Sequence, residues 1–110
     1  MQIVKLDLKK AFDYEEITTF DSDFAIADCF GEDAIKSTFK NCFRYAKLNH
    51  KYLTELVIVL NHRLWYHYRA GGQVHYAIAK LYDSLWREAD SYACEHLKGE
   101  EASYFYRVTD

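Results

Sequence analysis

The chain contains no proline, and its only four glycines are Gly31, Gly71, Gly72 and Gly99. Proline and glycine are the strongest helix breakers, so the long intervals between these glycines leave room for uninterrupted helices. We therefore expect an all-α protein in which the glycines mark helix ends.

Other absences limit the class of protein. The three cysteines do not form a CxxC pair, and with 50% hydrophobic residues a chain of 110 residues buries a core without disulfides. The first ten residues lack the apolar region of a signal peptide, and the longest aliphatic run, residues 56–60, is too short to cross a bilayer. We expect a soluble cytoplasmic protein with no membrane association and with reduced, mostly buried thiols.

Motifs that carry catalysis or bind cofactors are also missing. The sequence contains no GxSxG, no GxxxxGK[ST] and no glycine-rich loop. It has no HExxH or ExxH pair, and on a helix His62 and His67 would diverge by about 140°. We therefore expect no enzyme, no metal and no cofactor. A site assembled from separate helices is invisible to such a motif search and stays open.

Residues 49–97 contain two long helical patterns joined by Ala70-Gly71-Gly72. The first places an apolar residue at steps of three and four, at Leu53, Leu56, Val57, Leu60, Leu64 and Tyr68. The second repeats this spacing at Val74, Ala77, Ile78, Leu81, Leu85, Ala89 and Tyr92. Because the glycines fit a helix end and a tight reversal, we predict an antiparallel αα-hairpin with Leu56, Leu60, Leu64, Leu81 and Leu85 in its seam.

The remaining segments add shorter helices on either side of this hairpin. We predict helices over residues 8–17 and 24–30, and another opened by Glu32 and Asp33 with a core stripe at Ile35, Phe39, Cys42, Phe43 and Ala46. A final short helix follows Gly99. Residues 2–8 and 103–108 also fit strands. The prediction is a single domain, 1–110, forming an all-α bundle of about five helices around the hairpin.

Charge is unevenly distributed along the chain. Residues 1–35 hold 3 basic and 9 acidic side chains, whereas residues 36–69 hold 7 basic and 1 acidic. Four cations at helical spacing, Lys36, Lys40, Arg44 and Lys47, form one basic stripe. Because the net charge of the chain is −3, we expect this stripe to face the acidic N-terminal third rather than a nucleic acid.

The segment around residues 23–39 has the outline of a DNA-binding helix-turn-helix, with Gly31 in the turn. That motif needs apolar residues six and nine positions after the turn glycine, and here these are Ser37 and Lys40. We therefore do not expect a helix-turn-helix.

Large residues also lie outside the predicted hairpin stripes. On helical geometry Tyr68 continues the Leu64 stripe, but Val59, His62, Tyr66 and Tyr76 point away from the seam. Tyrosine is favoured at protein interfaces because it combines apolar area with a hydroxyl group. We predict that these four residues form the surface that meets a partner protein or a second copy of the chain.

Three stretches, VLNHRLWYHY, LYDSLW and GEEASYFYRVTD, are similar to those of small, acidic, tyrosine-rich helical proteins of gut bacteria that carry no assigned function. The resemblance implies a soluble bacterial protein and an all-helical fold, and it transfers no site. The leading hypothesis is a non-enzymatic interaction or regulatory module. The alternatives are a nucleic-acid-associated protein that uses the basic stripe, and a small enzyme whose site is assembled from separate helices.

Overall fold

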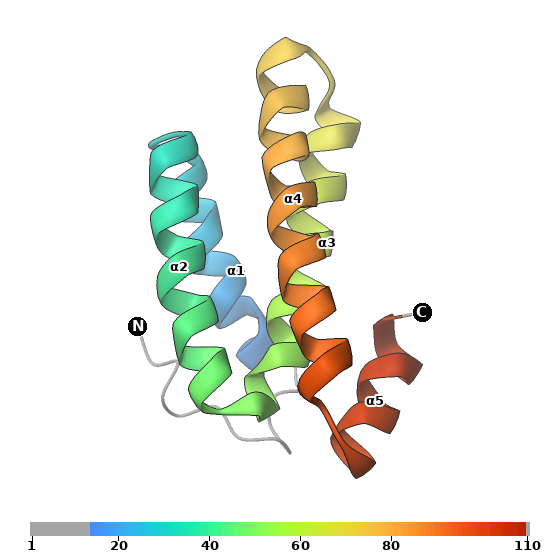
Figure 1. Cartoon of the computed structure of the whole chain (residues 1–110). Helices are drawn as coiled ribbons and strands as arrows, with labels where there is room; N and C mark the ends of the chain where they lie inside the picture. The colour runs from blue at the N-terminus through green and yellow to red at the C-terminus, as the bar shows by residue number, and fades with distance from the viewer. Residues whose placement is uncertain (1–13, 110) are drawn as a thin grey trace.

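The computed structural model describes residues 14–109, with side chains from residue 20 onward. Over this range the chain forms α1 (Tyr14–Asp28), α2 (Glu32–Leu48), a short 3₁₀ helix η3 (His50–Tyr52), α3 (Leu53–Ala70), α4 (Gln73–His96) and α5 (Gly99–Thr109). Figure 1 shows two antiparallel pairs side by side, α1 with α2 and α3 with α4, and α5 beside the lower part of the second pair. The predicted all-α bundle is confirmed.

The α3–α4 hairpin is the central unit, because these two helices share the most extensive contact among the described elements. Gly71 and Gly72 connect them with positive φ angles of 76° and 87°. Only glycine adopts such angles without steric cost, so the glycine pair both ends α3 and allows the reversal. The predicted αα-hairpin is confirmed.

Helix α2 follows its predicted pattern closely. Glu32 and Asp33 lie in its first turn, where carboxylates stabilise the positive end of the helix dipole. The predicted stripe is buried at every position: Ile35, Phe39, Cys42, Phe43 and Ala46. Ser37 and Lys40 are exposed, so the positions that a helix-turn-helix would bury face solvent.

The first helical segment differs from the prediction. Two helices were expected, over residues 8–17 and 24–30, with loop and capping residues at 18–22 between them, but α1 continues from Tyr14 to Asp28. Its buried residues, Phe20, Phe24 and Ala27, form one stripe that packs against α2 and α3. This packing outweighs the weak preference of Thr, Asp and Ser for loops and helix caps. Residues 2–8, and the start of the first predicted helix, lie outside the described residues.

The seam of the hairpin is correct in its lower half and wrong near the bend. Leu56 and Leu60 are fully buried and Leu85 is nearly so, while Leu64 and Leu81 are partly buried against the core. In contrast, three residues that were assigned to the stripes are exposed: Tyr68, Val74 and Ala77. The hairpin extends past the α1–α2 pair, so no other helix among residues 14–109 covers its end (Figure 1).

Helix α3 is covered on more than one side below that point. Val59 and Glu55 are each only 1% exposed, although both point away from the predicted seam. Helices α1 and α2 both contact α3 and provide the cover. The apolar run of α3, residues 56–60, is therefore buried at four of its five positions, and Ile58 is partly buried.

The C-terminal segment is the helix α5, so the strand alternative for residues 103–108 is wrong. Phe105 anchors α5 and is 1% exposed. Of the three free thiols only Cys42 is buried, so the expectation of mostly buried thiols is wrong for Cys29 and Cys94. Within residues 14–109 no helix combines the length and apolar character that crossing a membrane requires.

Candidate functional site

The end of the α3–α4 hairpin, residues 65–76, exposes several large apolar and aromatic side chains, and we call it the hairpin tip. The exposed fractions are 45% for Trp65, 51% for Tyr66, 55% for Tyr68, 72% for Val74 and 53% for Tyr76. Solitary exposed apolar residues are ordinary, but a group of this size in one place marks a contact surface in many proteins.

The aromatic rings at the hairpin tip contact one another. The Trp65 and Tyr68 ring centroids lie 5.5 Å apart at 65°, in an edge-to-face arrangement. The Tyr68 and Tyr76 centroids lie 6.4 Å apart, which connects α3 to α4 across the bend. These contacts restrict the rotamers of the rings before any partner binds, which lowers the entropy cost of association.

Beside the tip, a shallow groove runs along α3. Its volume is about 650 Å³, and its lining residues are Ile58, Asn61, His62, Trp65, Tyr66, Arg69 and Ala70. We call it the α3 groove. Two of the predicted partner-surface residues, His62 and Tyr66, line it together.

The other two predicted residues are placed differently. Tyr76 is exposed, as expected, but it contacts Tyr68 at the tip and does not line the α3 groove. Val59 is buried in the core, so its assignment to the partner surface is wrong. The sequence of α3 shows that Val59 points away from α4, but it does not show that other helices cover that side.

Within residues 56–82 of the hairpin, charge has one sign. From Leu56 to Tyr82 the chain contains no Asp or Glu, while Arg69 and Lys80 are exposed cations. The Lys80 Nζ lies 5.6 Å from the centre of the Tyr76 ring, a cation–π distance. A surface that is aromatic and positive at once favours partners with carboxylate or phosphate groups.

Below the tip, Asp28 accepts hydrogen bonds from side chains of two other helices. Its Oδ2 accepts from Arg63 Nη2 and, at 2.6 Å, from His67 Nε2, both on α3. Its Oδ1 accepts from the Tyr82 hydroxyl on α4. We call these four residues the Asp28 network. It attaches the C-terminal end of α1 to both helices of the hairpin.

The aromatic surroundings hold the imidazole of His67 in place. Its ring stacks on Tyr82 with centroids 5.6 Å apart and an angle of 12°. Its Nδ1 lies 3.0 Å from the Nδ1 of His75, in the first turn of α4 on the other side of the bend. At this distance one Nδ1 donates a hydrogen bond to the other, and the tautomers of the two rings set the direction. The network therefore continues from Asp28 through His67 to the base of the tip.

Burial and neighbouring charges affect the ionisation of the network. Burial lowers the pKa of Arg63. The hydrogen bond to Asp28 and the charge of Asp28 raise this pKa by more than burial lowers it, so the net shift is upward. Asp21 adds to this, since its Oδ1 lies 3.7 Å from Arg63 Nη1. Burial, and then the hydrogen bond to Asp28, raises the pKa of the Tyr82 hydroxyl far above its usual value. Arg63 is thus a paired cation and Tyr82 a permanent donor.

The raised pKa of Tyr82 predicts a loss of stability in alkali. Above pH about 10 the unfolded chain ionises this hydroxyl while the folded chain keeps its proton. The free energy of unfolding therefore falls as pH rises, by up to about 1.4 kcal/mol per pH unit for this group. Urea denaturation at several pH values above 10 measures the slope, and Tyr82→Phe is expected to reduce it by that amount.

Cys42 contributes to the same slope and needs its own variant. Burial, with the negative charges of Asp23 and Glu55, raises the pKa of its thiol to about 12. Its contribution is present below the usual thiol pKa of about 8.5 and is lost as pH rises towards 12. Cys42→Ala measures how much of the alkaline slope comes from Cys42.

If Tyr82→Phe left the alkaline slope of the unfolding free energy unchanged, this would show that the Tyr82 hydroxyl is not buried against Asp28.

The basic stripe of α2 is solvent-exposed at all four positions: Lys36, Lys40, Arg44 and Lys47. Lys47 lies over the Phe43 ring at 4.4 Å, and Arg44 donates to Asn41 at 3.5 Å. No ion pair joins the stripe to a carboxylate whose side chain is described. The predicted pairing with the acidic N-terminal third is absent from these residues, and the carboxylates before residue 20 lie outside them.

Motif searching missed the Asp28 network because its members come from three helices. Arg63 and His67, which donate hydrogen bonds to Asp28, are 35 and 39 positions from it in the sequence, and Tyr82 is 54 positions from it. A usable signal was the i, i+4 pair of Arg63 and His67 on α3, just after the uninterrupted apolar run of residues 56–60. Among the described residues, no group of three or more His, Cys, Asp or Glu side chains is arranged to hold a metal ion.

Comparison of the chain with family models, with curated proteins and with solved structures found no match. The site is therefore interpreted from its own geometry and chemistry.

Proposed function

We propose that this protein is a non-enzymatic interaction module that binds another protein through the hairpin tip and the adjoining α3 groove. The observation that carries the proposal is the exposure, by 45% or more, of four aromatic side chains and Val74 at one end of the molecule. Tyr and Trp are enriched at protein interfaces and often dominate their binding energy.

The Asp28 network supports this proposal because it makes the base of the tip rigid. Asp28 fixes Arg63, and the guanidinium of Arg63 lies 4.7 Å from the centre of the Tyr66 ring. His67, bound to the same carboxylate, contacts His75 across the bend. A rigid platform loses little conformational entropy when a partner binds.

The enzyme alternative draws on the same network, since it is a polar site assembled from separate helices. We interpret the network as structural because its groups are directed at one another. Asp28, His67 and Tyr82 do not line the α3 groove, where a ligand could enter. We also propose a bacterial, cytoplasmic setting, in which the exposed thiols of Cys29 and Cys94 stay reduced.

Tyr66→Ala is expected to weaken association about tenfold or more, since truncation of a central interface tyrosine often costs more than 1.4 kcal/mol. The same change should cost less than about 1 kcal/mol of folding stability, because Tyr66 is half exposed. Sedimentation of the purified protein tests self-association. Quantitative mass spectrometry of proteins retained by the immobilised chain, with nuclease present, tests binding to other proteins.

The matched control is the double variant Lys40→Glu, Arg44→Glu in the basic stripe, which should leave protein association unchanged. It also tests the nucleic-acid alternative, for which the exposed stripe is the supporting observation. Two results together would favour the nucleic-acid alternative over our proposal. The wild type would bind nucleic acid in a salt-sensitive way that the double variant abolishes, and Tyr66→Ala would retain the same proteins as the wild type.

A further inference from the structure

We infer that the α3 groove binds an amphipathic helix of a different protein, and that this helix carries carboxylates facing the groove. The inference rests on the proposed function and names the class of partner. Three properties of the groove support it: the helical spacing of its lining, its continuity with the track of α5, and its charge.

The lining of the α3 groove has the repeat of a helix-packing face. Ile58, Asn61, Trp65 and Arg69 follow at steps of three and four along α3, and His62 and Tyr66 widen the same face. From Ile58 to Arg69 the helix rises about 16 Å, which equals about three turns of a partner helix. Side chains at this spacing form the ridges and grooves into which a second helix packs.

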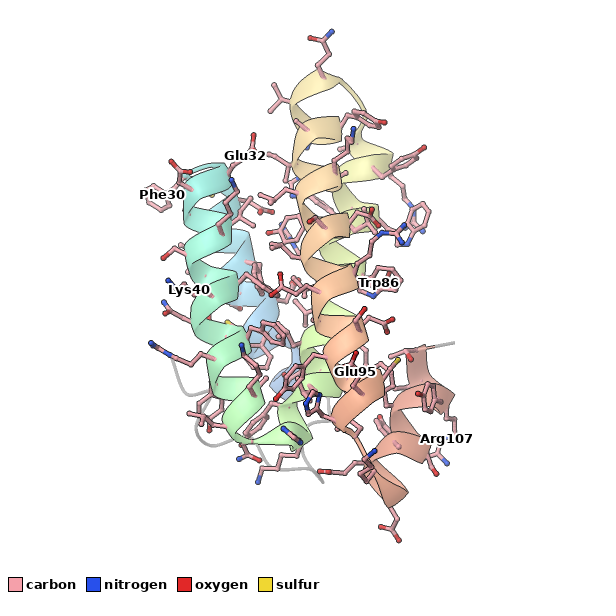
Figure 2. All side chains as sticks on the ribbon, viewed as in Figure 1. Phe30, Glu32, Lys40, Trp86, Glu95 and Arg107 are labelled. Atoms are coloured by element: carbon pink, nitrogen blue, oxygen red, sulfur yellow. The ribbon has the colours of Figure 1, made fainter. Side chains whose placement is uncertain are left out.

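Helix α5 shows that a helix already packs on this side of the hairpin. Its last residues, Val108 and Thr109, border a smaller depression of about 220 Å³ together with Ile58, Asn61 and Trp86. Figure 2 shows Trp86 on the side of α4 above α5. Ile58 and Asn61 also begin the α3 groove, so the groove continues the track of α5 towards the hairpin tip.

The charge of the groove selects among possible occupants. Besides the Trp65 indole and the Tyr66 hydroxyl, its polar side chains are Asn61, His62 and Arg69, and it contains no carboxylate. Arg63, the other cation of this segment, is already paired with Asp28. A helix with Asp or Glu along one edge would pair with Arg69 and accept hydrogen bonds from Asn61 and His62.

A second copy of the chain fits this surface less well. Two identical faces in contact would bring both Arg69 side chains and both His62 side chains together without a carboxylate from residues 56–82 of either copy. A nucleic acid also fits less well, because the groove offers one permanent cation among Ile58, Trp65 and Ala70. The occupant that matches both the shape and the charge is an acidic amphipathic helix.

Site-specific photo-cross-linking in the full chain tests this inference. The photoreactive amino acid p-benzoylphenylalanine replaces Asn61 in the groove, or Tyr68 at the tip, and cross-linked peptides are identified by mass spectrometry in a lysate of the source cells. We expect the position-61 reagent to capture one segment of another protein, with Asp or Glu at helical spacing. That segment is then made as a fluorescent peptide, and its affinity for the unmodified chain is measured by fluorescence anisotropy.

The charge pairing is tested with Arg69→Glu, which is expected to weaken peptide binding at least tenfold. Replacing the facing carboxylate of the peptide by Lys should restore binding to this variant. The control is Arg87→Glu, since Arg87 is an exposed arginine on α4 outside the groove, and it should bind the peptide as the wild type does. Circular dichroism confirms that both variants fold.

Any other outcome overturns the inference. Comparing cross-links from position 61 with those from position 68 distinguishes failure of the inference from failure of the proposed function. Position-61 cross-links to a second copy, to nucleic acid or to a segment without carboxylates would overturn it, as would binding that Arg69→Glu does not change. Cross-links at position 68 without any at position 61 would keep the proposed function but remove the helix from the groove. No cross-link to protein at either position would overturn both.

Discussion

Replacing Asp28 by Asn is expected to lower the free energy of unfolding by about 3–5 kcal/mol, the usual cost of removing one partner from a buried ion pair. The side chains of Asp28 and Arg63 are each only 10% exposed, so solvent cannot replace the lost charge. Asn keeps the shape of Asp, and the loss therefore reports charge and hydrogen bonding rather than a cavity. Tyr82 and His67 lose the same anionic acceptor.

Urea denaturation at pH 7, followed by circular dichroism, measures this effect. The control is Asp33→Asn, which removes a carboxylate exposed in the first turn of α2 and should cost less than about 1 kcal/mol. An equal, small loss in both variants would mean that Asp28 is solvated and that the network does not attach α1 to the hairpin.

The helices themselves follow from local patterns in the sequence, and this explains which parts of the fold were predictable. The stripe from Ile35 to Ala46 predicted the buried face of α2, and Gly71 with Gly72 predicted the bend. The continuity of α1 was not predictable in this way. Thr18 and Thr19 favour a loop locally, while the buried Phe20 and Phe24 stabilise the helix only through contacts with distant elements.

Burial along the hairpin depends on what lies beside it, which helical periodicity does not reveal. Val59 and Tyr66 both point away from the seam, yet one is 1% exposed and the other 51%. Val59 belongs to the core cluster with residues of α1, α2 and α4, whereas Tyr66 belongs to the hairpin tip. The end of the hairpin extends past the α1–α2 pair (Figure 1). For the same reason Val74 and Tyr68 continue an apolar stripe in the sequence but lie in solvent.

Which face of α4 is buried also depends on contacts with other helices. The prediction placed Leu81 in the seam, but the fully buried residue is the neighbouring Tyr82. Tyr82 is buried because its hydroxyl donates to Asp28 and its ring stacks on His67 and contacts Phe24 edge to face. A polar residue is buried only when its partner is buried with it, and the partner lies on a helix far away in the sequence.

Leu60→Ala is expected to cost about 2–5 kcal/mol of folding stability, the range for a leucine truncated inside a packed core. Leu60 is 0% exposed on α3, among core residues of α1, α2 and α4. Leu64 lies one turn nearer the bend and is only partly buried against that core, so Leu64→Ala should cost less. Leu48 is 82% exposed at the end of α2, and Leu48→Ala should cost less than about 0.5 kcal/mol.

Because all three variants make the same chemical change, their order reports burial alone. Chemical denaturation of each, compared at equal m-value, gives the differences in the free energy of unfolding. The expected order of the losses is Leu60, then Leu64, then Leu48, because Leu60 is fully buried, Leu64 partly buried and Leu48 exposed. A loss below about 0.5 kcal/mol for Leu60→Ala would mean that α3 is rotated about its axis. The same rotation would move Trp65 and Arg69 out of the α3 groove and remove the geometric basis of the proposed contact.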